Sequence, residues 1–413
     1  MMPDSFTSQG GIARTAGREW LMQALRRTRA RTHALFAAYQ KGLVATHLAV
    51  PFSGEVNPPL WELGHIGWFQ EWWIARNRDR GLGVQANPDC TRMLSRLAGA
   101  DGLYDSGRVP HDSRWTLPFP DAAATHRYLQ DVLDDTLALL GSSEEDDASL
   151  YFFRLALFHE DMHSEAAVYM AQSLGIALPA EIAFPRGISY VGVQRADAIR
   201  LPGGKWELGA GANVSGFSFD NELGMHAETL APFEIDAELV TWMRYLPFVE
   251  ACGYDQKQWW TAEGWEWLQR VKLDAPRYLR MQDGHWQRQS FGIWQPLDLS
   301  AAATHIGYHE AQAWCRWAGR RLPTETEWEC AALTSPEFHW GKVWEWTAST
   351  FMPFPDFVAH PYRDYSAPWF GTRQVLRGAC DATASQMIHP KYRNFFTPDR
   401  NDIFAGFRTR AGD

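Results

Sequence analysis

Several classes of protein are excluded by what this sequence lacks. No window reaches about 18 consecutive apolar residues, so we expect no membrane-spanning helix. Lys and Arg never gather into a basic run and the formal net charge is −10, which argues against nucleic-acid binding. Residues 1–18 contain no apolar core of a secretory signal, so we expect a cytoplasmic protein.

Cysteine is also scarce. The five cysteines are odd in number and widely spaced, at Cys90, Cys252, Cys315, Cys330 and Cys380. They form neither a CxxC pair nor the framework of a disulfide-rich domain. We therefore expect small buried side chains in place of redox centres.

Tryptophan is abundant by contrast, with 21 residues in a chain of 413. Most of them must lie in the core, but aromatic side chains also suit the recognition of quaternary ammonium groups. The length exceeds that of one ordinary hydrophobic core, so two domains are expected.

The composition and the predicted secondary structure of the sequence change near its middle. Residues 1–178 predict four amphipathic helices, at 16–40, 59–79, 120–140 and 150–174, which together form a bundle. Residues 179–200 contain Pro and Gly and are predicted to be a linker. Residues 201–413 are rich in Gly, Trp and short apolar runs, with helices expected at 240–252 and 308–318 and strands at 233–236 and 374–378. The predicted fold class is α+β, with a helical bundle followed by an irregular α+β domain.

The most informative motif is the pair His159 and His163. Both fall on the apolar face of the helix expected over 150–174, one turn apart, close enough to hold one metal ion. Two buried histidines in a helix core would explain the same spacing.

A third histidine favours the metal. His65 shares a stripe with Trp61 and Trp68 in the helix that Asn57 is expected to cap, and a polar group in so apolar a stripe needs a partner. Three imidazoles leave positions open on an ion, as catalysis requires, and suit Zn, Fe, Cu and Ni alike. Glu165 would be an alternative ligand, but its side chain points away from the face that His159 and His163 share. We therefore expect it to lie next to the metal ligands without binding the metal itself.

Longer motifs resemble a known family. Residues 57–76 and 158–165 resemble the DinB-like four-helix bundle of the ergothioneine-type sulfoxide synthases. The second half resembles the formylglycine-generating-enzyme-like domain, with its C-type-lectin-like fold, that is fused to the bundle in that family. The matching segments keep the family's order and lie at 219–222, 318–325, 327–329, 343–347, 361–366, 392–395 and 406–408.

This resemblance implies a non-haem Fe(II) enzyme whose substrates are O2, hercynine (the trimethylated betaine of histidine) and a sulfur or selenium donor. It makes His65, His159 and His163 the iron ligands. Tyr362 matches a tyrosine that donates a proton or hydrogen atom, and the hercynine-binding positions match Tyr365, Asn394 and Phe395. We expect the pocket between the bundle and the C-terminal domain.

The identity of the donor depends on departures from the family. Members that use γ-glutamylcysteine tend to have an acidic residue where this chain has Phe396, and often a glutamine where it has Met162. Both changes remove polar groups, and the chain most resembles the selenoneine synthase branch, which joins hercynine to a selenosugar and forms a selenoxide on the way to selenoneine. Arg108 and Arg114 are candidates for donor contacts, with ordinary surface charge as the alternative.

Three other functions compete with this one. An ergothioneine-type reaction with cysteine or γ-glutamylcysteine would use the same residues. Formylglycine-generating chemistry requires two cysteines near the C-terminus, and residues 377–394 contain only Cys380. A non-catalytic, metal-stabilised binding module would have no need of the paired tyrosines.

Overall fold

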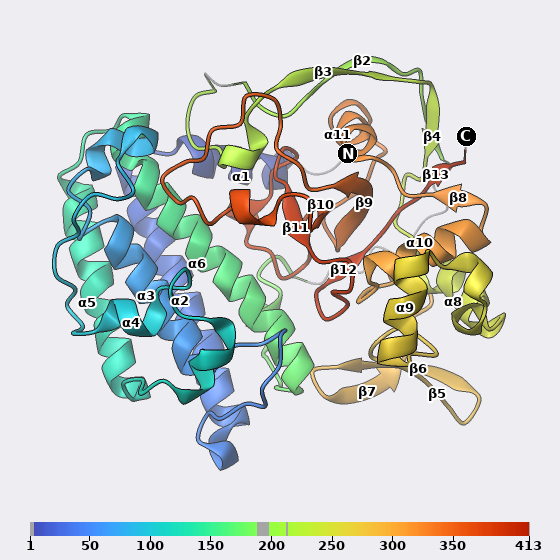
Figure 1. Ribbon diagram of the computed structural model, residues 1–413, viewed down its shortest axis with the longest axis horizontal. Helices are drawn as coiled ribbons and strands as arrows, with labels where there is room; N and C mark the ends of the chain where they lie inside the picture. Colours follow the sequence, from blue (N-terminus) through green and yellow to red (C-terminus); the bar gives the residue numbers. More distant parts are fainter. Residues whose placement is uncertain (1–3, 188–197, 212–213, 413) are drawn as a thin grey trace.

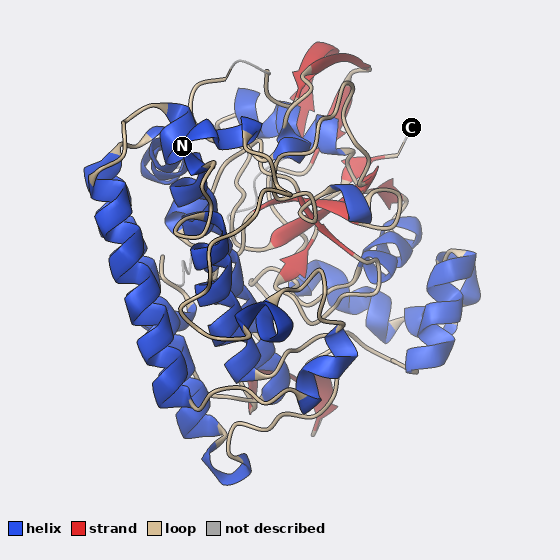
Figure 2. Cartoon of the chain, turned by 60° about the vertical axis from the view of Figure 1, so that its left-hand side comes forward, coloured by secondary structure: helices blue, strands red, loops and turns tan. Residues whose placement is uncertain are grey.

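The computed structural model describes residues 4–187, 198–211 and 214–412, and it has the expected α+β fold class. Helices fill the first part of the chain, and small sheets with short helices fill the second (Figures 1 and 2). Most of the expected linker, residues 188–197, lies outside the described residues.

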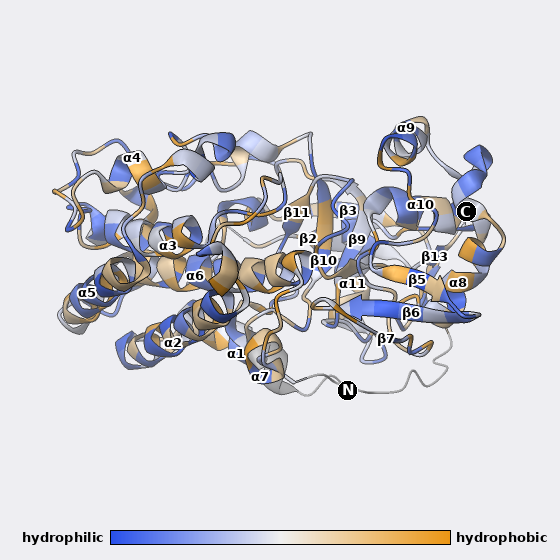
Figure 3. Cartoon of the chain, turned by 90° about the horizontal axis from the view of Figure 1, so that it is seen from below, coloured by the Kyte–Doolittle hydropathy of each residue, from blue (hydrophilic) through white to orange (hydrophobic). Residues whose placement is uncertain are grey.

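The bundle consists of four long helices, with α1 (Asp4–Thr15) leading into it: α2 (Arg18–Gly42), α3 (Pro59–Trp73), α5 (Ala122–Gly141) and α6 (Asp147–Leu174). Hydrophobic and hydrophilic residues alternate around α2 and α5 (Figure 3), as amphipathic helices require. Two short helices, α4 (Ala100–Tyr104) and α7 (Ala180–Ala183), complete the set. No helix of the described ranges is long and apolar enough to cross a membrane.

Local signals explain where α6 begins and ends. The Asp146 side chain accepts a hydrogen bond from the backbone N–H of Ser149, which caps the first turn. Gly175 ends the helix with φ 68°, in the left-handed region that glycine adopts readily.

Helix α3 differs from expectation in its last residue and in the residue that caps its start. The helix ends at Trp73, well before residue 79, because Arg76 turns back to form two hydrogen bonds with Asp101 at 2.6 and 2.9 Å. Pro58 occupies the N-cap position, and the side chain of Asn57 does not cap the helix. That side chain instead donates a hydrogen bond to Glu62 Oε1 at 2.5 Å.

The second part contains two four-stranded sheets. One has the order β1 (Ile199–Leu201), β4 (Phe233–Ile235), β13 (Arg410–Ala411) and β8 (Arg320–Arg321). The other has the order β11 (Asn394–Phe396), β10 (Gln374–Gly378), β9 (Trp344–Thr350) and β12 (Ala405–Gly406). In the second sheet β10 is antiparallel to both neighbours, with Val375 opposite Phe395. This register places Asn394 and Phe395 on an edge strand.

The remaining elements surround these sheets. They are the hairpin of β2 (Gly204–Leu208) and β3 (His226–Leu230), the three-stranded β5 (Leu279–Gln282), β6 (His285–Ser290) and β7 (Ile293–Pro296), and the helices α8 (Trp242–Glu250), α9 (Ala262–Val271), α10 (Tyr308–Trp317) and α11 (Glu325–Thr334). Helices α8 and α10 lie within the expected ranges. The short helices α9 and α11 were not expected from the sequence.

Glu165 joins the two parts of the molecule, and its hydrogen bonds go to the second part and not to the three histidines. It accepts hydrogen bonds from Trp344 Nε1 at 2.6 Å and from Thr383 Oγ1 at 2.5 Å. The expectation that it surrounds the metal ligands is therefore wrong. Its position two residues after His163 turns it to the opposite side of α6, where β9 packs.

Candidate metal centre

His65 on α3 meets His159 and His163 on α6. One ring nitrogen of each can be chosen so that all three lie within 4.8 Å of one another. The three ring centroids are 4.5 to 5.1 Å apart. His65 and His159 are only 2% and 3% exposed, so the cluster is largely shielded from solvent.

Each imidazole is held by a different contact. His65 Nδ1 donates to the carbonyl oxygen of Tyr104 at 2.7 Å, and His163 Nδ1 lies 2.6 Å from Glu62 Oε2. The His159 ring stacks on Phe69 with centroids 3.5 Å apart. Because Nδ1 is engaged in His65 and His163, the Nε2 atoms of both rings remain available to a metal ion, and such outer contacts orient ligating histidines in proteins.

Glu62 was not recognised from the sequence. It lies one turn before His65 on the same helix. A carboxylate within so apolar a segment is the sequence signal that could have identified it. Burial acts to raise the pKa of Glu62, but the adjacent His163 leaves that pKa below its ordinary value. The carboxylate is therefore charged and can accept a hydrogen bond from His163 Nδ1.

Burial also keeps two of the imidazoles neutral. It lowers the pKa of His65 to about 3, and the neighbouring His163 acts in the same direction. The pKa of His159 is lowered well below its ordinary value, mainly by burial. Neutral imidazole is the form that binds metals, so this set of three nitrogen donors fits a divalent transition-metal ion.

A central cavity of about 450 Å³ opens beside the histidines. It lies between the bundle and the second part of the chain and is lined by Ser106, Gly107, Arg114, His159, Met162, His163, Tyr362, Asp364, Tyr365, Pro368, Trp369 and Phe395. Five residues chosen from the sequence (Arg114, Met162, Tyr362, Tyr365 and Phe395) are thus brought together around the three histidines. The expected pocket between the two parts exists.

The two tyrosines of this cavity differ in their contacts. Within the described ranges, the hydroxyl of Tyr362 forms no hydrogen bond, and its ring stands edge-on to His159 with centroids 6.3 Å apart. The hydroxyl of Tyr365 lies 3.1 Å from that of Tyr392, which was not singled out from the sequence. Tyr362 therefore has the freer hydroxyl.

A second, smaller cavity lies on the other side of Met162 and His163. Its volume is about 210 Å³, and Asn394, Phe396 and Tyr392 line it. Asn394 and Phe396 thus lie near the histidines but outside the central cavity. Phe395 faces the central cavity and stacks on Phe351 with centroids 4.1 Å apart.

The two candidate arginines occupy different environments. Arg114 is buried, with its guanidinium 3.7 Å from the Trp61 ring centroid and Nη1 donating to Asn57 Oδ1 at 2.8 Å, so it is no ordinary surface charge. The Arg108 side chain is 71% exposed and pairs with Asp105 at 3.1 Å. It lines a third cavity, next to the central one.

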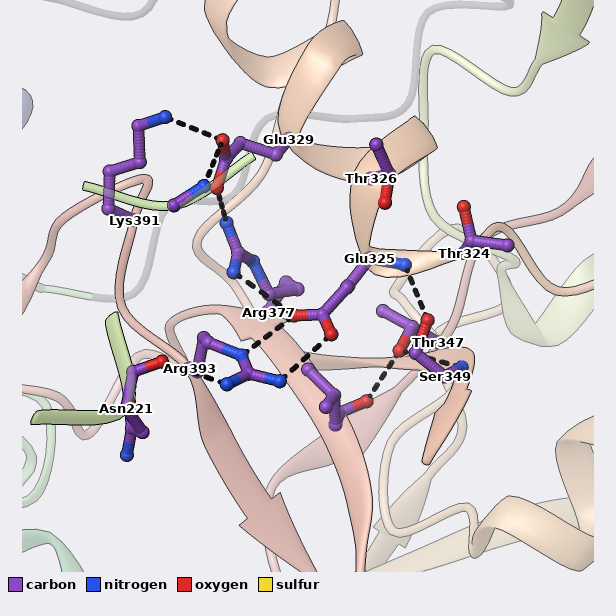
Figure 4. Close-up of polar contacts among 12 residues, drawn as sticks. Asn221, Thr324, Glu325, Thr326, Glu329, Thr347, Ser349, Arg377, Lys391 and Arg393 are labelled. Carbon is purple, nitrogen blue, oxygen red and sulfur yellow. Dashed lines mark hydrogen bonds and ion pairs between the residues drawn. The ribbon is translucent and has the colours of Figure 1, made fainter. Parts of the chain in front are cut away.

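A buried ionic network fixes the strand that carries Asn394 and Phe395. Figure 4 shows Glu325 and Glu329 of α11 facing Arg393, Arg377 and Lys391. Arg393 forms hydrogen bonds with both carboxylate oxygens of Glu325 at 2.8 and 2.9 Å, and Lys391 approaches Glu329 at 2.6 Å. Because Arg393 immediately precedes Asn394, this network sets where β11 enters the site.

Comparisons with known proteins match both parts of the chain. Residues 23–171 match the DinB superfamily, and residues 189–342 and 337–411 match the sulfatase-modifying factor enzyme 1-like domain. The hercynine oxygenase of Mycolicibacterium smegmatis is 31% identical over 407 residues, covering 86% of this chain and 90% of that protein.

Two further relatives help to define the match. The hercynine oxygenase of Mycobacterium tuberculosis is 30% identical over 403 residues, with 86% of this chain and 90% of that protein covered. The formylglycine-generating enzyme of Streptomyces coelicolor is 26% identical over 284 residues, covering 51% of this chain and 87% of that protein. Similarity to the hercynine oxygenases therefore extends through both parts.

Proposed function

Because the chain belongs to the ergothioneine-type sulfoxide synthase family, we propose that it is an iron- and O2-dependent oxidoreductase acting on hercynine. The observation that carries this proposal is the meeting of three imidazoles, two of them held neutral by burial, with a cavity lined by two tyrosines. In this proposal residues 1–178 hold the iron and residues 201–413 bind substrate, with residues 179–200 as the linker.

His65, His159 and His163 would hold Fe(II), which supplies the redox chemistry with O2 when it is bound. Three protein ligands leave positions for substrates on the cavity side. Glu62 would keep His163 oriented through its Nδ1, and Phe69 would do the same for His159 by stacking.

Hercynine would bind where the central and Asn394-lined cavities meet. Tyr365 and Phe395 offer aromatic faces to its trimethylammonium group, each contact stabilising the complex by about 0.5–2 kcal/mol. Asn394 offers an amide to a polar group. Tyr362 would donate the proton or hydrogen atom, which its free hydroxyl favours.

The donor in this proposal is a selenosugar, and the product a selenoxide on the way to selenoneine. Met162 and Phe396 contribute uncharged side chains to the smaller cavity. Its lining also includes the carboxyl groups of Asp161 and Glu165, which disfavour a donor carboxylate and so suit a neutral donor. Cysteine and γ-glutamylcysteine are the competing donors, with Arg114 as the residue that would favour their carboxylates.

The metal assignment is tested by comparing His159→Ala with His33→Ala, a histidine on the neighbouring helix α2. His159→Ala should lose iron loading and turnover together, whereas His33→Ala should keep both. Full iron content and activity in His159→Ala would overturn the assignment.

The function is tested with anaerobically reconstituted Fe(II) protein, hercynine, O2 and each donor in turn, with the products identified by mass spectrometry. Faster turnover with 1-selenoglucose than with cysteine or γ-glutamylcysteine supports the selenosugar. The reverse order would leave an ergothioneine-type synthase, and no turnover with any donor despite bound iron would favour a non-catalytic binding module.

A further inference from the structure

Helix α1 lies outside both family matches, which begin at residues 23 and 189, and it contributes no residue to the cavities described above. It packs against the short 3-10 helix η8 (Ser385–Met387) in the second part of the chain. The approach is close, because a side chain added at Gly10 would collide with the carbonyl oxygen of Ile388. The start of the chain is therefore held by the second part before it leads into the bundle (Figure 1).

Arg14, in the last turn of α1, binds residues 217–222, which we call the clasp segment. Its guanidinium donates to both carboxylate oxygens of Glu222, at 2.6 and 2.8 Å, and to the carbonyl oxygen of Phe217 at 3.3 Å. Its own carbonyl oxygen accepts a hydrogen bond from the backbone N–H of Phe217 at 2.8 Å. The ion pair is buried, with 8% of the Arg14 side chain and 0% of the Glu222 side chain exposed. A planar guanidinium suits such a bidentate contact, whereas a lysine ammonium presents a single point charge.

The clasp segment supports the ring of Tyr365. Phe219 stacks on Tyr365 with centroids 4.6 Å apart and meets Tyr392 edge-on at 5.4 Å. The backbone N–H of Phe219 donates to Glu222 Oε2 at 3.1 Å, and this oxygen also accepts from Arg14. One carboxylate thus joins Arg14 to the residue that stacks on Tyr365.

Two polar residues of the clasp segment bind the residue that follows Tyr365. Ser366 Oγ donates to Asp220 Oδ1 at 2.5 Å and accepts from Asn221 Nδ2 at 3.0 Å. The carbonyl oxygen of Asn221 also accepts from Arg393 Nη1 at 2.8 Å, just before strand β11 begins. The clasp segment therefore contacts both segments through which the second part reaches the cavities beside the histidines.

We propose that Arg14 is a positioning residue of the substrate pocket, and that it acts through Glu222 and Phe219 to fix the ring of Tyr365 at the wall of the central cavity. Side chains of a binding site must be held within about 0.5 Å of their productive positions, and the stack and hydrogen bonds of the clasp segment supply this constraint. Among the described residues, Arg14 forms no hydrogen bond or ion pair with the three histidines. The effect on hercynine rests on the proposed function, but the effect on the position of Tyr365 does not.

The first test follows Tyr365 by fluorine NMR in protein labelled with fluorotyrosine, with its signal identified by its loss in Tyr365→Phe. Arg14→Lys keeps a cation beside Glu222, but it cannot bridge both carboxylate oxygens. We expect the Tyr365 signal to shift or broaden in this variant. The matched control is Arg410→Lys, since Arg410 pairs with Glu327 at 3.0 Å in the second part and its side chain is also 8% exposed. The control should leave the Tyr365 signal in place.

The second test measures hercynine conversion by the iron-loaded protein. Arg14→Lys should raise the KM for hercynine about tenfold and change kcat by less than about twofold, because the wall of the pocket is displaced while the histidines stay in place. The Fe(II) dissociation constant should not change. A general loss of stability would not separate these three quantities.

A variant at the other end of the route shows whether Arg14 acts through the stacked ring. Phe219→Leu removes the ring but leaves the pair of Arg14 with Glu222, and it should reproduce the changed Tyr365 signal and the raised KM. Because both variants break one route, the double variant Arg14→Lys/Phe219→Leu should raise KM no further than the larger single effect. Full additivity would show two separate routes and would overturn the proposal.

Failure of this inference can be distinguished from failure of the proposed function. A native Tyr365 signal in Arg14→Lys, or an equal change in Arg410→Lys, would overturn the positioning role whatever the reaction is. An unchanged KM in Arg14→Lys would overturn the role in hercynine binding and leave the family reaction intact. If the Tyr365 signal changes as expected but the native protein converts no hercynine, the positioning of Tyr365 stands and the proposed function is wrong.

Discussion

The contact between Glu62 and His163 predicts how tightly the three histidines would hold the proposed Fe(II) ion. Glu62 Oε2 lies 2.6 Å from His163 Nδ1, and Asn57 donates to the other carboxylate oxygen at 2.5 Å. Loss of such an outer contact weakens metal binding about 10- to 100-fold, or about 1.4–2.7 kcal/mol. We expect Glu62→Gln near the lower value, because its carbonyl oxygen can still accept from His163, and Glu62→Ala near the upper value.

The dissociation constant is measured by anaerobic Fe(II) titration of the metal-free protein against a competing chelator. Glu71→Gln is the matched control, since Glu71 is a buried glutamate on the same helix. It accepts hydrogen bonds from Ser95 and Tyr128 at 2.6 and 2.8 Å, and neither contact reaches the histidines. Glu71→Gln should therefore lower the free energy of unfolding but leave the Fe(II) dissociation constant unchanged.

Two outcomes would refute this reasoning. Native Fe(II) affinity in both Glu62 variants would show that His163 needs no outer partner to be a ligand. An equal loss of affinity in Glu71→Gln would show that iron binding responds to general loosening of α3 and not to the Glu62 contact.

Three further predictions concern other parts of the molecule. The free energy of unfolding of Tyr362→Phe should stay within about 0.5 kcal/mol of the native value. The yield of the product that joins hercynine to the donor should fall, and an unchanged yield would indicate that Tyr365 donates the proton instead. Burial raises the pKa of Glu310 from 4.5 to about 7, so native stability should fall by up to about 3 kcal/mol as pH rises from 4.5 to 7. Glu310→Gln should lose that pH dependence in urea denaturation, and an equal dependence in both proteins would contradict it. Glu325→Gln should cost about 3–5 kcal/mol by leaving buried Arg393 uncompensated, and a loss below about 1 kcal/mol in urea denaturation would argue against the network.

Local rules made part of the site predictable from sequence. The spacing of His159 and His163 places both on one face of any helix that contains them, whatever surrounds it. The run from 150 to 174 is long and periodic enough to specify α6, with Asp146 and Gly175 marking its ends. Resemblance to the family, and not periodicity, identified Tyr362, Tyr365 and Phe395, which the structure brings beside the histidines.

Only the tertiary structure decided which polar groups meet. Glu62 reaches His163 on a different helix, Glu165 reaches the second part of the chain, and Arg114 is buried against Trp61. Periodicity assigns a side chain to a face of its own helix, but the partner of a buried polar group depends on which elements pack against that face. For this reason the sequence by itself determined the histidine pair and the fold class, whereas packing between the two parts determined the cavities and the orientation of the histidines beside them.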